Sequence, residues 1–259
     1  MPSPPVPPTG RLIGVGVGPG DPEYLTRQAM RVLGESPRIV APTTAIDAVG
    51  RAEAVVREAC PELVARIERL VFDMVPDGVA DGASSRAASH RRAAGRLVPW
   101  LDAGEQVAFV TLGDPSIYST FSSLTSAVRE LRPEIEIGCV PGIMAFQALA
   151  ARTGTPLVDG TQSLRLLTAL EGADEVASAL EVDRTAIVVY KGGRHLPLIA
   201  KVLAEAGRLD GSWMGELLGL AGERIVPVAD AGTGPATYLA TVIIPAAVRP
   251  AVEPAGGAG

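Results

Sequence analysis

The chain has 259 residues, of which 47% are hydrophobic and 20% are charged, so it can bury a substantial apolar core. Its formal net charge of −6 argues against general nucleic-acid binding, because the chain has no overall positive field to attract phosphates. The longest apolar stretch, at 238–248, is interrupted by Pro245 and is far shorter than a membrane-spanning helix requires. These features exclude disordered, fibrous and membrane-spanning classes and favour a globular protein.

In the first half, apolar strand-like runs alternate with segments of helical period, in the order strand 11–17, helix 22–33, strand 38–41, helix 47–59, helix 85–103, strand 106–111, helix 119–131 and strand 135–140. In the second half, the expected elements are a helix at 143–153, strands at 164–169 and 185–190, a helix at 196–206, and strands at 212–220 and 238–244. This alternation is typical of βαβ units, and it predicts an α/β fold with largely parallel sheets. The late strands are spaced by turns, which predicts a mixed sheet in the second half.

A domain boundary is expected near Pro141 and Gly142, which gives domains at 10–141 and 142–248. Both ends of the chain are low in complexity and poor in apolar side chains. The tails at 1–9 and 249–259 are therefore predicted to be disordered.

The two cysteines, Cys60 and Cys139, have neither metal-ligand spacing nor the pattern of a disulfide framework. Their thiols are expected to be buried or incidental in a reducing compartment, which favours a cytoplasmic location. The first residues also lack the basic and apolar regions of a secretory signal. The two histidines, His90 and His195, are too few and too far apart in sequence to predict a metal site.

The first predicted strand runs into a glycine-rich turn at 14–21, where Asp21 can cap a helix that begins at Pro22. Glycines without Cβ atoms let a ligand approach the backbone closely. The dinucleotide fingerprint G-x-G-x-x-G fails in every register, because its sixth position falls on Pro19 or on Asp21. An acidic cap and a proline also disfavour a phosphate site. A tight turn with a purely structural role is the alternative.

Two further glycine turns follow predicted strands, at 111–120 and at 140–145. Asp114 places a carboxylate at the carboxyl end of a buried strand, where ligands bind in open α/β sheets. As an alternative, Asp114 or Ser119 could serve only as a helix N-cap. Each turn by itself is weak evidence, but the three together indicate one ligand-binding cleft.

Here the sequence resembles a known family. The N-terminal Val-Gly-x-Gly-Pro-Gly-Asp-Pro at 15–22, the Gly-Asp-Pro loop at 113–115 and the Val-Pro-Gly-Ile turn at 140–143 resemble, in this order and spacing, the tetrapyrrole methylases, which transfer methyl groups from S-adenosylmethionine. The segments 190–196, 213–220 and 223–227 resemble the precorrin-2 C20-methyltransferase branch of cobalamin synthesis. The likeness covers about residues 10 to 247.

The resemblance implies two αβα domains, a homodimer, and a folded S-adenosylmethionine in the cleft between the domains. It also implies which residues contact this methyl donor. They are Pro19, Leu112, Gly113, Asp114, Ile117, Met144, Ala145 and Gly232. Lys191 falls where relatives often carry methionine, so only its backbone is expected to contact the donor.

Methyl transfer from a sulfonium to a meso carbon disperses positive charge, so a carboxylate tight against the sulfur would favour the ground state over the transition state. We therefore expect carbonyl oxygens there, and we expect Asp114 to orient the amino-acid or ribose part of the donor. Holding both reactants aligned could supply about 7–11 kcal/mol of the barrier. The sequence identifies no catalytic general base.

The implied tetrapyrrole carries many carboxylates, so an acidic protein needs a local basic lining to bind it. Arg194 and His195 are candidates for this lining, and Tyr118 or Tyr24 could stack on the ring. A further basic set lies on one predicted helix and comprises Arg86, Arg91, Arg92 and Arg96. A solvated helix face for this set, a helix cap at His195 and core roles for the tyrosines are the alternatives.

The leading hypothesis is methylation of C20 of precorrin-2 to give precorrin-3A, with a small-molecule tetrapyrrole as partner and with neither nucleic acid nor membrane. Rivals within the same fold are a tetrapyrrole methylase of different regiochemistry, the cobalt-precorrin-2 enzyme, and a relative that modifies protein or ribosomal RNA. A nicotinamide-dependent oxidoreductase would need the missing fingerprint. A noncatalytic binding module would not need three converging loops.

Overall fold

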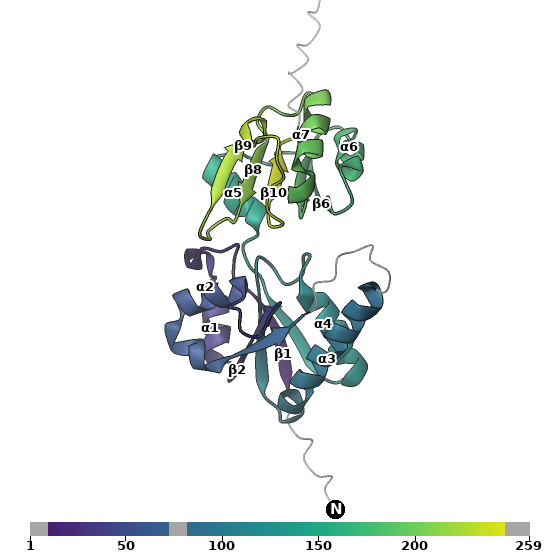
Figure 1. The fold of residues 1–259 in the computed structure, drawn as a ribbon. Coiled ribbons are helices and arrows are strands. Elements are labelled where there is room, and N and C mark those ends of the chain that lie inside the picture. Colours follow the sequence, from purple (N-terminus) through teal and green to yellow (C-terminus); the bar gives the residue numbers. More distant parts are fainter. Residues whose placement is uncertain (1–9, 73–81, 247–259) are drawn as a thin grey trace, which may run out of the picture. The chain divides into compact units, whose positions relative to one another are not determined.

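The computed structural model describes residues 10–72 and 82–246, so the predicted tails lie outside the described residues. The chain splits into two compact units, unit 1 at Met1–Ala145 and unit 2 at Phe146–Gly259. Each unit contains one five-stranded sheet (Figure 1). The predicted α/β class is confirmed.

Unit 1 is built on a parallel sheet of order β3-β2-β4-β1-β5. Its strands are β1 (Arg11–Gly16), β2 (Arg38–Thr43), β3 (Ile67–Val71), β4 (Gln106–Thr111) and β5 (Glu136–Val140). Its helices are η1 (Pro22–Tyr24), α1 (Arg27–Glu35), α2 (Arg51–Ala59), η2 (Pro61–Arg66), α3 (Gly82–Asp102) and α4 (Thr120–Leu131). The inner residues of the central strands β1 and β4 are apolar because helices cover both faces of the sheet.

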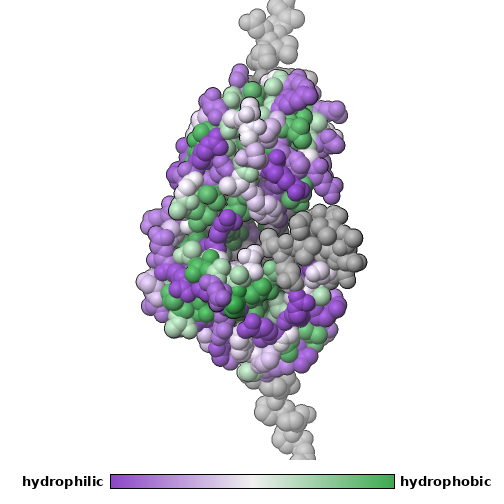
Figure 2. All heavy atoms as spheres, in the orientation of Figure 1, coloured by the Kyte–Doolittle hydropathy of each residue, from purple (hydrophilic) through white to green (hydrophobic). Residues whose placement is uncertain are grey.

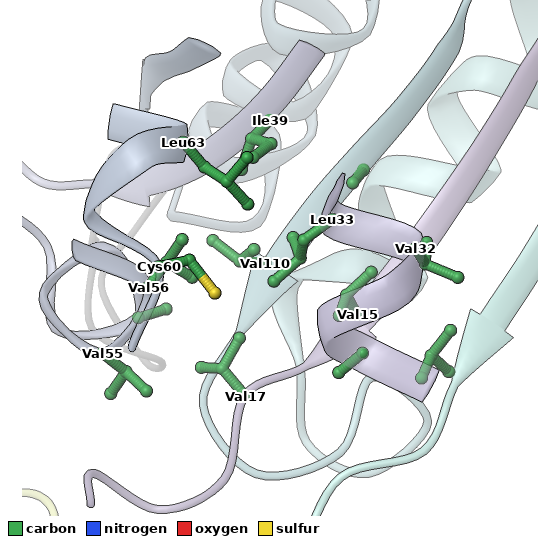
Figure 3. Packing of buried hydrophobic residues seen from close by; sticks show 14 of the residues in the cluster. Val15, Val17, Val32, Leu33, Ile39, Val55, Val56, Cys60, Leu63 and Val110 are labelled. Carbon is green, nitrogen blue, oxygen red and sulfur yellow. The ribbon is translucent and has the colours of Figure 1, made fainter. Parts of the chain in front are cut away.

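Alternate side chains of each strand enter different cores, so unit 1 has three layers. On one face, Ile13 and Val15 of β1 share a core with Leu33 of α1 and Val56 of α2. Figure 3 shows Val15, Leu33 and Val56 in this core. On the other face, Leu12 and neighbouring strand residues pack against α3 and α4. Figure 1 shows α1 and α2 on one side of this sheet and α3 and α4 on the other.

The single helix predicted at 22–33 is wrong, because the chain forms two shorter helices there. Asp21 caps η1 as expected, since its Oδ1 accepts a hydrogen bond from the N–H of Glu23 at 2.9 Å. The backbone then becomes extended, and the hydroxyl of Thr26 accepts from the N–H of Ala29 at 3.0 Å to begin α1. The apolar spacing alone predicts one continuous helix, but N-capping by Thr26 starts a second helix there.

Unit 2 is built on a mixed sheet of order β6-β7-β10-β8-β9, as the turn-spaced late strands predicted. β6 and β7 are parallel, whereas β10 is antiparallel to both β7 and β8, and β9 is antiparallel to β8. The strands are β6 (Ser163–Thr168), β7 (Thr185–Tyr190), β8 (Trp213–Glu216), β9 (Arg224–Pro227) and β10 (Thr241–Ile244). The helices are α5 (Ala145–Thr153), α6 (Asp174–Leu180), η3 (Gly193–His195), α7 (Leu196–Glu205) and η4 (Val228–Asp230).

The sequence missed the strands β3 and β9, the helix α6 and the short helices η2, η3 and η4. Each is short, and β3 and β9 lie at the sheet edges, where burial is partial and the hydrophobic pattern is weak. The core of unit 2 packs α6 and α7 against one face of its sheet, with Val176, Ile199, Ile187 and Val242 among the buried residues. On the opposite face, Leu149 of α5 approaches Gly215 of β8.

The surface visible in Figure 2 is mostly hydrophilic on each unit, with smaller hydrophobic areas between the polar ones. Within the part of the chain that the structure describes, no helix is both long and apolar enough to cross a membrane.

Candidate functional site

Three loops meet at the carboxyl ends of β1, β4 and β5, where β1 lies between the other two strands. Gly16 is the last residue of β1, Gly113 and Gly142 lie in the loops after β4 and β5, and the backbones of the three glycines touch. A Cβ atom added at Gly142 would lie 2.1 Å from the carbonyl oxygen of Gly113 and 2.8 Å from the Cα of Gly16. A Cβ at Gly16 would lie 2.5 Å from the same carbonyl oxygen. The three glycine turns therefore converge because none of them carries a side chain at the contact.

The first two loops also form a short backbone bridge. The N–H of Gly113 donates to the carbonyl of Gly18 at 2.8 Å, and the N–H of Val17 donates to Thr111 at 3.0 Å. Gly18 has φ +82° and Gly113 has φ +65°, a region that L side chains rarely adopt. Both glycines are thus required by backbone conformation at the edge of the sheet.

Asp114 ties the second loop to the third. Its Oδ2 accepts a hydrogen bond from the N–H of Gly142 at 3.0 Å. Its Oδ1 accepts from the N–H of Ser116 at 2.8 Å and also from the Ser116 hydroxyl. The N-cap of α4 is instead Ser119, which accepts from the N–H of Phe121. Asp114 is therefore a carboxylate that holds two loops together.

The carboxyl of Asp114 is ionised at neutral pH. Burial raises its pKa, but the Ser116 hydroxyl and the N–H groups of Ser116 and Gly142 outweigh that effect and leave the pKa below its ordinary value. A carboxylate has about four acceptor positions, and these contacts use three of them.

The other predicted donor contacts of unit 1 lie in the same three loops. Pro19 is buried beside Gly18 in the first loop, and Leu112 and Ile117 are half-buried in the second. Met144 is buried, and its sulfur would lie 3.1 Å from a Cβ added at Gly113. Ala145 follows as the first residue of α5. The seven unit 1 residues of the predicted set thus lie in the three loops or, for Ala145, directly after them.

Two tyrosines lie near the first two loops, Tyr24 at the end of η1 and Tyr118 in the second loop. Tyr24 packs on the first loop, where its Cβ would lie 2.9 Å from a Cβ added at Gly18. Tyr118 has φ +50°, which is uncommon for a bulky residue, and the residue is 47% exposed. Backbone strain of this kind clusters at ligand sites.

The candidates in unit 2 lie after its strands. Gly232 is exposed and has φ +88°, with open space around its missing side chain. Lys191 follows β7 with φ +57°, and its ammonium lies 5.9 Å from the ring centroid of Tyr238. Arg194 donates to the carbonyl of Leu170 and contacts the His195 ring, whose Nε2 also lies 3.3 Å from that carbonyl.

The basic set of the predicted helix lies on α3, apart from the three glycine loops in sequence. Arg91 forms a long 3.4 Å ion pair with Glu130 of α4, and both side chains are exposed. The ring of His90 lies beside that of Phe72, with centroids 5.4 Å apart and the planes tilted by 49°. Arg92 and Arg96 are exposed and Arg86 is half-buried. In residues 10–72 and 82–246, no group of three or more His, Cys, Asp and Glu could hold a metal ion.

Sequence reasoning missed Glu216, a buried carboxylate at the end of β8. It accepts from the N–H of Thr237 at 2.6 Å and from Arg224 at 2.9 Å. Burial raises its pKa, but these two partners outweigh that effect and keep the pKa below its ordinary value. The sequence signal that could have identified Glu216 is a carboxylate at the end of an apolar run, followed eight residues later by an arginine on the next strand of a short hairpin.

The family described as Tetrapyrrole (Corrin/Porphyrin) Methylases matches residues 11–231, which include all three glycine loops. The chain belongs to the tetrapyrrole methylase family. The predicted resemblance is thus confirmed. The match ends at Ala231, immediately before Gly232, so it covers most of both units.

Curated members of the tetrapyrrole methylase family match most of the chain. The cobalamin biosynthesis protein CobIJ of Mycobacterium tuberculosis is 34% identical over 94% of this chain and 47% of its own length. The chain therefore spans about half the length of the first curated relatives. The precorrin-2 C(20)-methyltransferase of a Sinorhizobium species is 32% identical over 91% of this chain and 95% of its own. The cobalt-precorrin-2 C(20)-methyltransferase of Salmonella typhimurium is 32% identical over 83% and 86%.

Solved structures of tetrapyrrole methylases share the fold. Cobalt precorrin-4 methyltransferase matches with a TM-score of 0.65 and 19% identity, over 91% of this chain and 94% of its own. The uroporphyrin-III C-methyltransferase of Thermus thermophilus, solved with S-adenosylhomocysteine, matches with a TM-score of 0.60 and 22% identity, over 91% and 97%. These likenesses show the two-sheet α/β fold.

Proposed function

We propose that the chain is an S-adenosylmethionine-dependent methyltransferase that methylates C20 of precorrin-2 to give precorrin-3A in cobalamin biosynthesis. The observation that carries this proposal is the contact of Gly16, Gly113 and Gly142 beside the ionised Asp114 at one sheet edge. Family membership and two relatives named for C20 methylation, each matched over most of its length, support the reaction and its position.

The residues at this edge fit the methyl donor. S-Adenosylmethionine supplies a methyl group on a positively charged sulfonium, and it also carries amino, carboxyl, ribose and adenine groups. Asp114 offers a negative charge, while the glycine loops present backbone groups without side chains. Leu112, Ile117 and Met144 add apolar surface in the same loops.

In the proposed reaction, the chain acts mainly by positioning. Carbonyl groups of the glycine loops face the sulfonium, and Asp114 orients the amino-acid or ribose part from a distance. A carboxylate directly on the sulfur would stabilise the ground state more than the transition state. Alignment of donor and acceptor carbon could supply about 7–11 kcal/mol of the barrier. In unit 2, Gly232 contributes an exposed backbone contact to the donor.

The substrate carboxylates are proposed to bind Arg194 and His195, with Tyr118 stacking on the ring. Arg194 uses its Nε and one terminal nitrogen in contacts with His195 and Leu170, which leaves other N–H groups of its five for a carboxylate. The exposed ring of Tyr118 offers a flat apolar surface.

A second candidate substrate is the cobalt form of the same ring, because the Salmonella typhimurium relative is named for cobalt-precorrin-2. We also propose that the enzyme is a cytoplasmic homodimer that needs no metal cofactor of its own. The free thiols of Cys60 and Cys139 fit a reducing compartment.

The test combines product analysis with ligand binding. Incubation with a labelled methyl donor and either precorrin-2 or its cobalt form, followed by NMR, is expected to place the new methyl group at C20. S-Adenosylhomocysteine should raise the melting temperature, whereas NADH should not. A methyl group found at another carbon would contradict the proposed C20 regiochemistry. Stabilisation by NADH alone would contradict the methyltransferase assignment.

A further inference from the structure

The segment 228–240 carries Gly232 between β9 and β10, and most of it lies outside helices and strands. Residues 232–235 are exposed, as are Thr237 and Tyr238. Val228, Ala231 and Ala240 are buried in the core of unit 2, but the exposed residues between Ala231 and Ala240 gain little from apolar burial. Fixing their backbone therefore costs conformational entropy that other contacts must offset. Specific polar anchors are therefore needed to hold Gly232 in one place.

The first anchor is Glu216 at the end of β8. Its Oε1 accepts from the N–H of Thr237 at 2.6 Å, on the carboxyl-terminal side of Gly232. The adjoining backbone also packs on η3, since the N–H of Ala236 donates to Gly193 at 2.8 Å. A Cβ at Gly193 would lie 1.9 Å from the carbonyl oxygen of Thr237, so this contact is close.

The second anchor is Arg224 on β9, directly across the hairpin from Glu216. One terminal nitrogen of Arg224 donates to Glu216 at 2.9 Å, and the other donates to the carbonyl of Ala231 at 2.6 Å. Ala231 immediately precedes Gly232. One ion pair therefore holds the segment on both sides of the glycine.

Charge and burial make this pair different from a surface salt bridge. The Glu216 side chain is 9% exposed, and an unpaired carboxylate at that depth would carry a large desolvation cost. The Glu216 carboxylate binds a guanidinium and a backbone N–H at the same time, and this two-point contact favours a single arrangement of the segment. Loss of the carboxylate would release Thr237 and leave Arg224 with only the Ala231 carbonyl.

We propose that Glu216 is a positioning residue for donor binding, acting with Arg224 to fix the backbone of Gly232. The inference rests on the proposed function, because Gly232 is a donor contact only if the chain binds S-adenosylmethionine. Glu216 itself does not touch the donor in this scheme.

Glu223 provides a matched control in the same unit. It also pairs with an arginine, Arg152, and accepts from one backbone N–H, that of Gly219 at 2.7 Å. Its contacts hold the loop between β8 and β9 instead of the segment 228–240. Glu216→Gln and Glu223→Gln each remove the negative charge that pairs with an arginine and replace one acceptor oxygen by an NH₂ group. They differ in which segment they loosen.

The experiment measures S-adenosylhomocysteine affinity by calorimetry, the melting temperature, and amide hydrogen exchange across 231–240 without ligand. Glu216→Gln is expected to weaken the affinity about tenfold, which corresponds to about 1.4 kcal/mol, and to speed exchange at Thr237. Glu223→Gln should leave the affinity within about twofold of the wild-type value, even if its melting temperature falls as much as that of Glu216→Gln.

The outcomes separate the two claims. Wild-type affinity in Glu216→Gln, or equal weakening in both variants, would overturn the positioning role while leaving the proposed function in place. A wild-type chain that binds no S-adenosylhomocysteine would overturn the proposed function and this inference with it. If Glu216→Gln does not fold, Arg224→Lys, which keeps the charge but cannot hold Glu216 and the Ala231 carbonyl together, should show weaker affinity and faster exchange at Ala231. Unchanged affinity in Arg224→Lys would contradict the proposal.

Discussion

The two units each use a carboxylate to hold a neighbouring loop at a strand end, but they do so differently. In unit 1, Asp114 binds neutral donors, namely the Ser116 hydroxyl and the N–H groups of Ser116 and Gly142. In unit 2, Glu216 combines one backbone N–H with the guanidinium of Arg224. Neutral donors suffice in unit 1 because the loops are already packed backbone against backbone.

The difference follows from how each segment is otherwise supported. The three glycine loops of unit 1 are short extensions of adjacent parallel strands, so the sheet brings them together. The segment 228–240 of unit 2 is longer and more exposed, and it has no comparable strand support. An ion pair there replaces the constraint that close glycine packing gives in unit 1.

The largest effect is expected from Gly142→Ala, which tests the backbone packing of unit 1. The added Cβ would lie 2.1 Å from the carbonyl oxygen of Gly113, where no flexible side chain can yield. Overpacking of this kind costs about 1–3 kcal/mol, and strain placed on the loops should weaken S-adenosylhomocysteine binding by up to roughly a hundredfold. Calorimetry and thermal unfolding measure both effects.

Gly95→Ala is the control for that variant. Gly95 is exposed on α3, and nothing lies within 4 Å of its missing side chain. Alanine there should stabilise the protein by about 0.5–1 kcal/mol and leave binding unchanged, because the helix gains propensity. Equal binding by Gly142→Ala and Gly95→Ala would show that the glycine contact does not shape the site.

A smaller effect is expected from Asp114→Ala, which removes the carboxylate and leaves the packed glycines. The N–H of Gly142 loses its acceptor, at a cost of about 1–3 kcal/mol. Affinity for S-adenosylhomocysteine should fall about tenfold. Asp102→Ala is the control, since it removes only a surface pair with Arg132 and should change little. Unchanged affinity in Asp114→Ala would remove Asp114 from the donor site.

The smallest expected effect concerns acid pH. Burial raises the pKa of Asp114 and of Glu216, but hydrogen bonds, and Arg224 in the case of Glu216, outweigh it, so the pKa of each carboxyl is lower when folded. Each therefore adds stability that is complete above the ordinary carboxyl pKa of about 4 and is lost as the pH falls through the lower folded pKa.

Urea unfolding at a series of pH values measures this contribution. The free energy of unfolding should decline below about pH 4, and the decline should be shallower in Asp114→Asn and in Glu216→Gln than in the wild type. A decline of unchanged steepness in Glu216→Gln would mean that Arg224 does not favour the ionised carboxylate.

Most of the fold was predictable because long strands and helices have strong local patterns. The strands at 106–111 and 185–190 were placed as the structure has them, since each is a continuous apolar run between polar turns. The break before Thr26 and the edge strands β3 and β9 were missed, because capping chemistry and sheet position decided them. The contacts of Asp114 and Glu216 depend on residues distant in the sequence and could not be derived from it.

The sequence by itself determined the α/β class, the three glycine turns at strand ends and the resemblance to the tetrapyrrole methylases, because these features depend on local composition and spacing. Only the tertiary structure decided that Gly16, Gly113 and Gly142 touch, and that a buried Glu216 anchors the segment around Gly232. The physical reason is that backbone contact and the burial of a charge depend on how strands are ordered in a sheet.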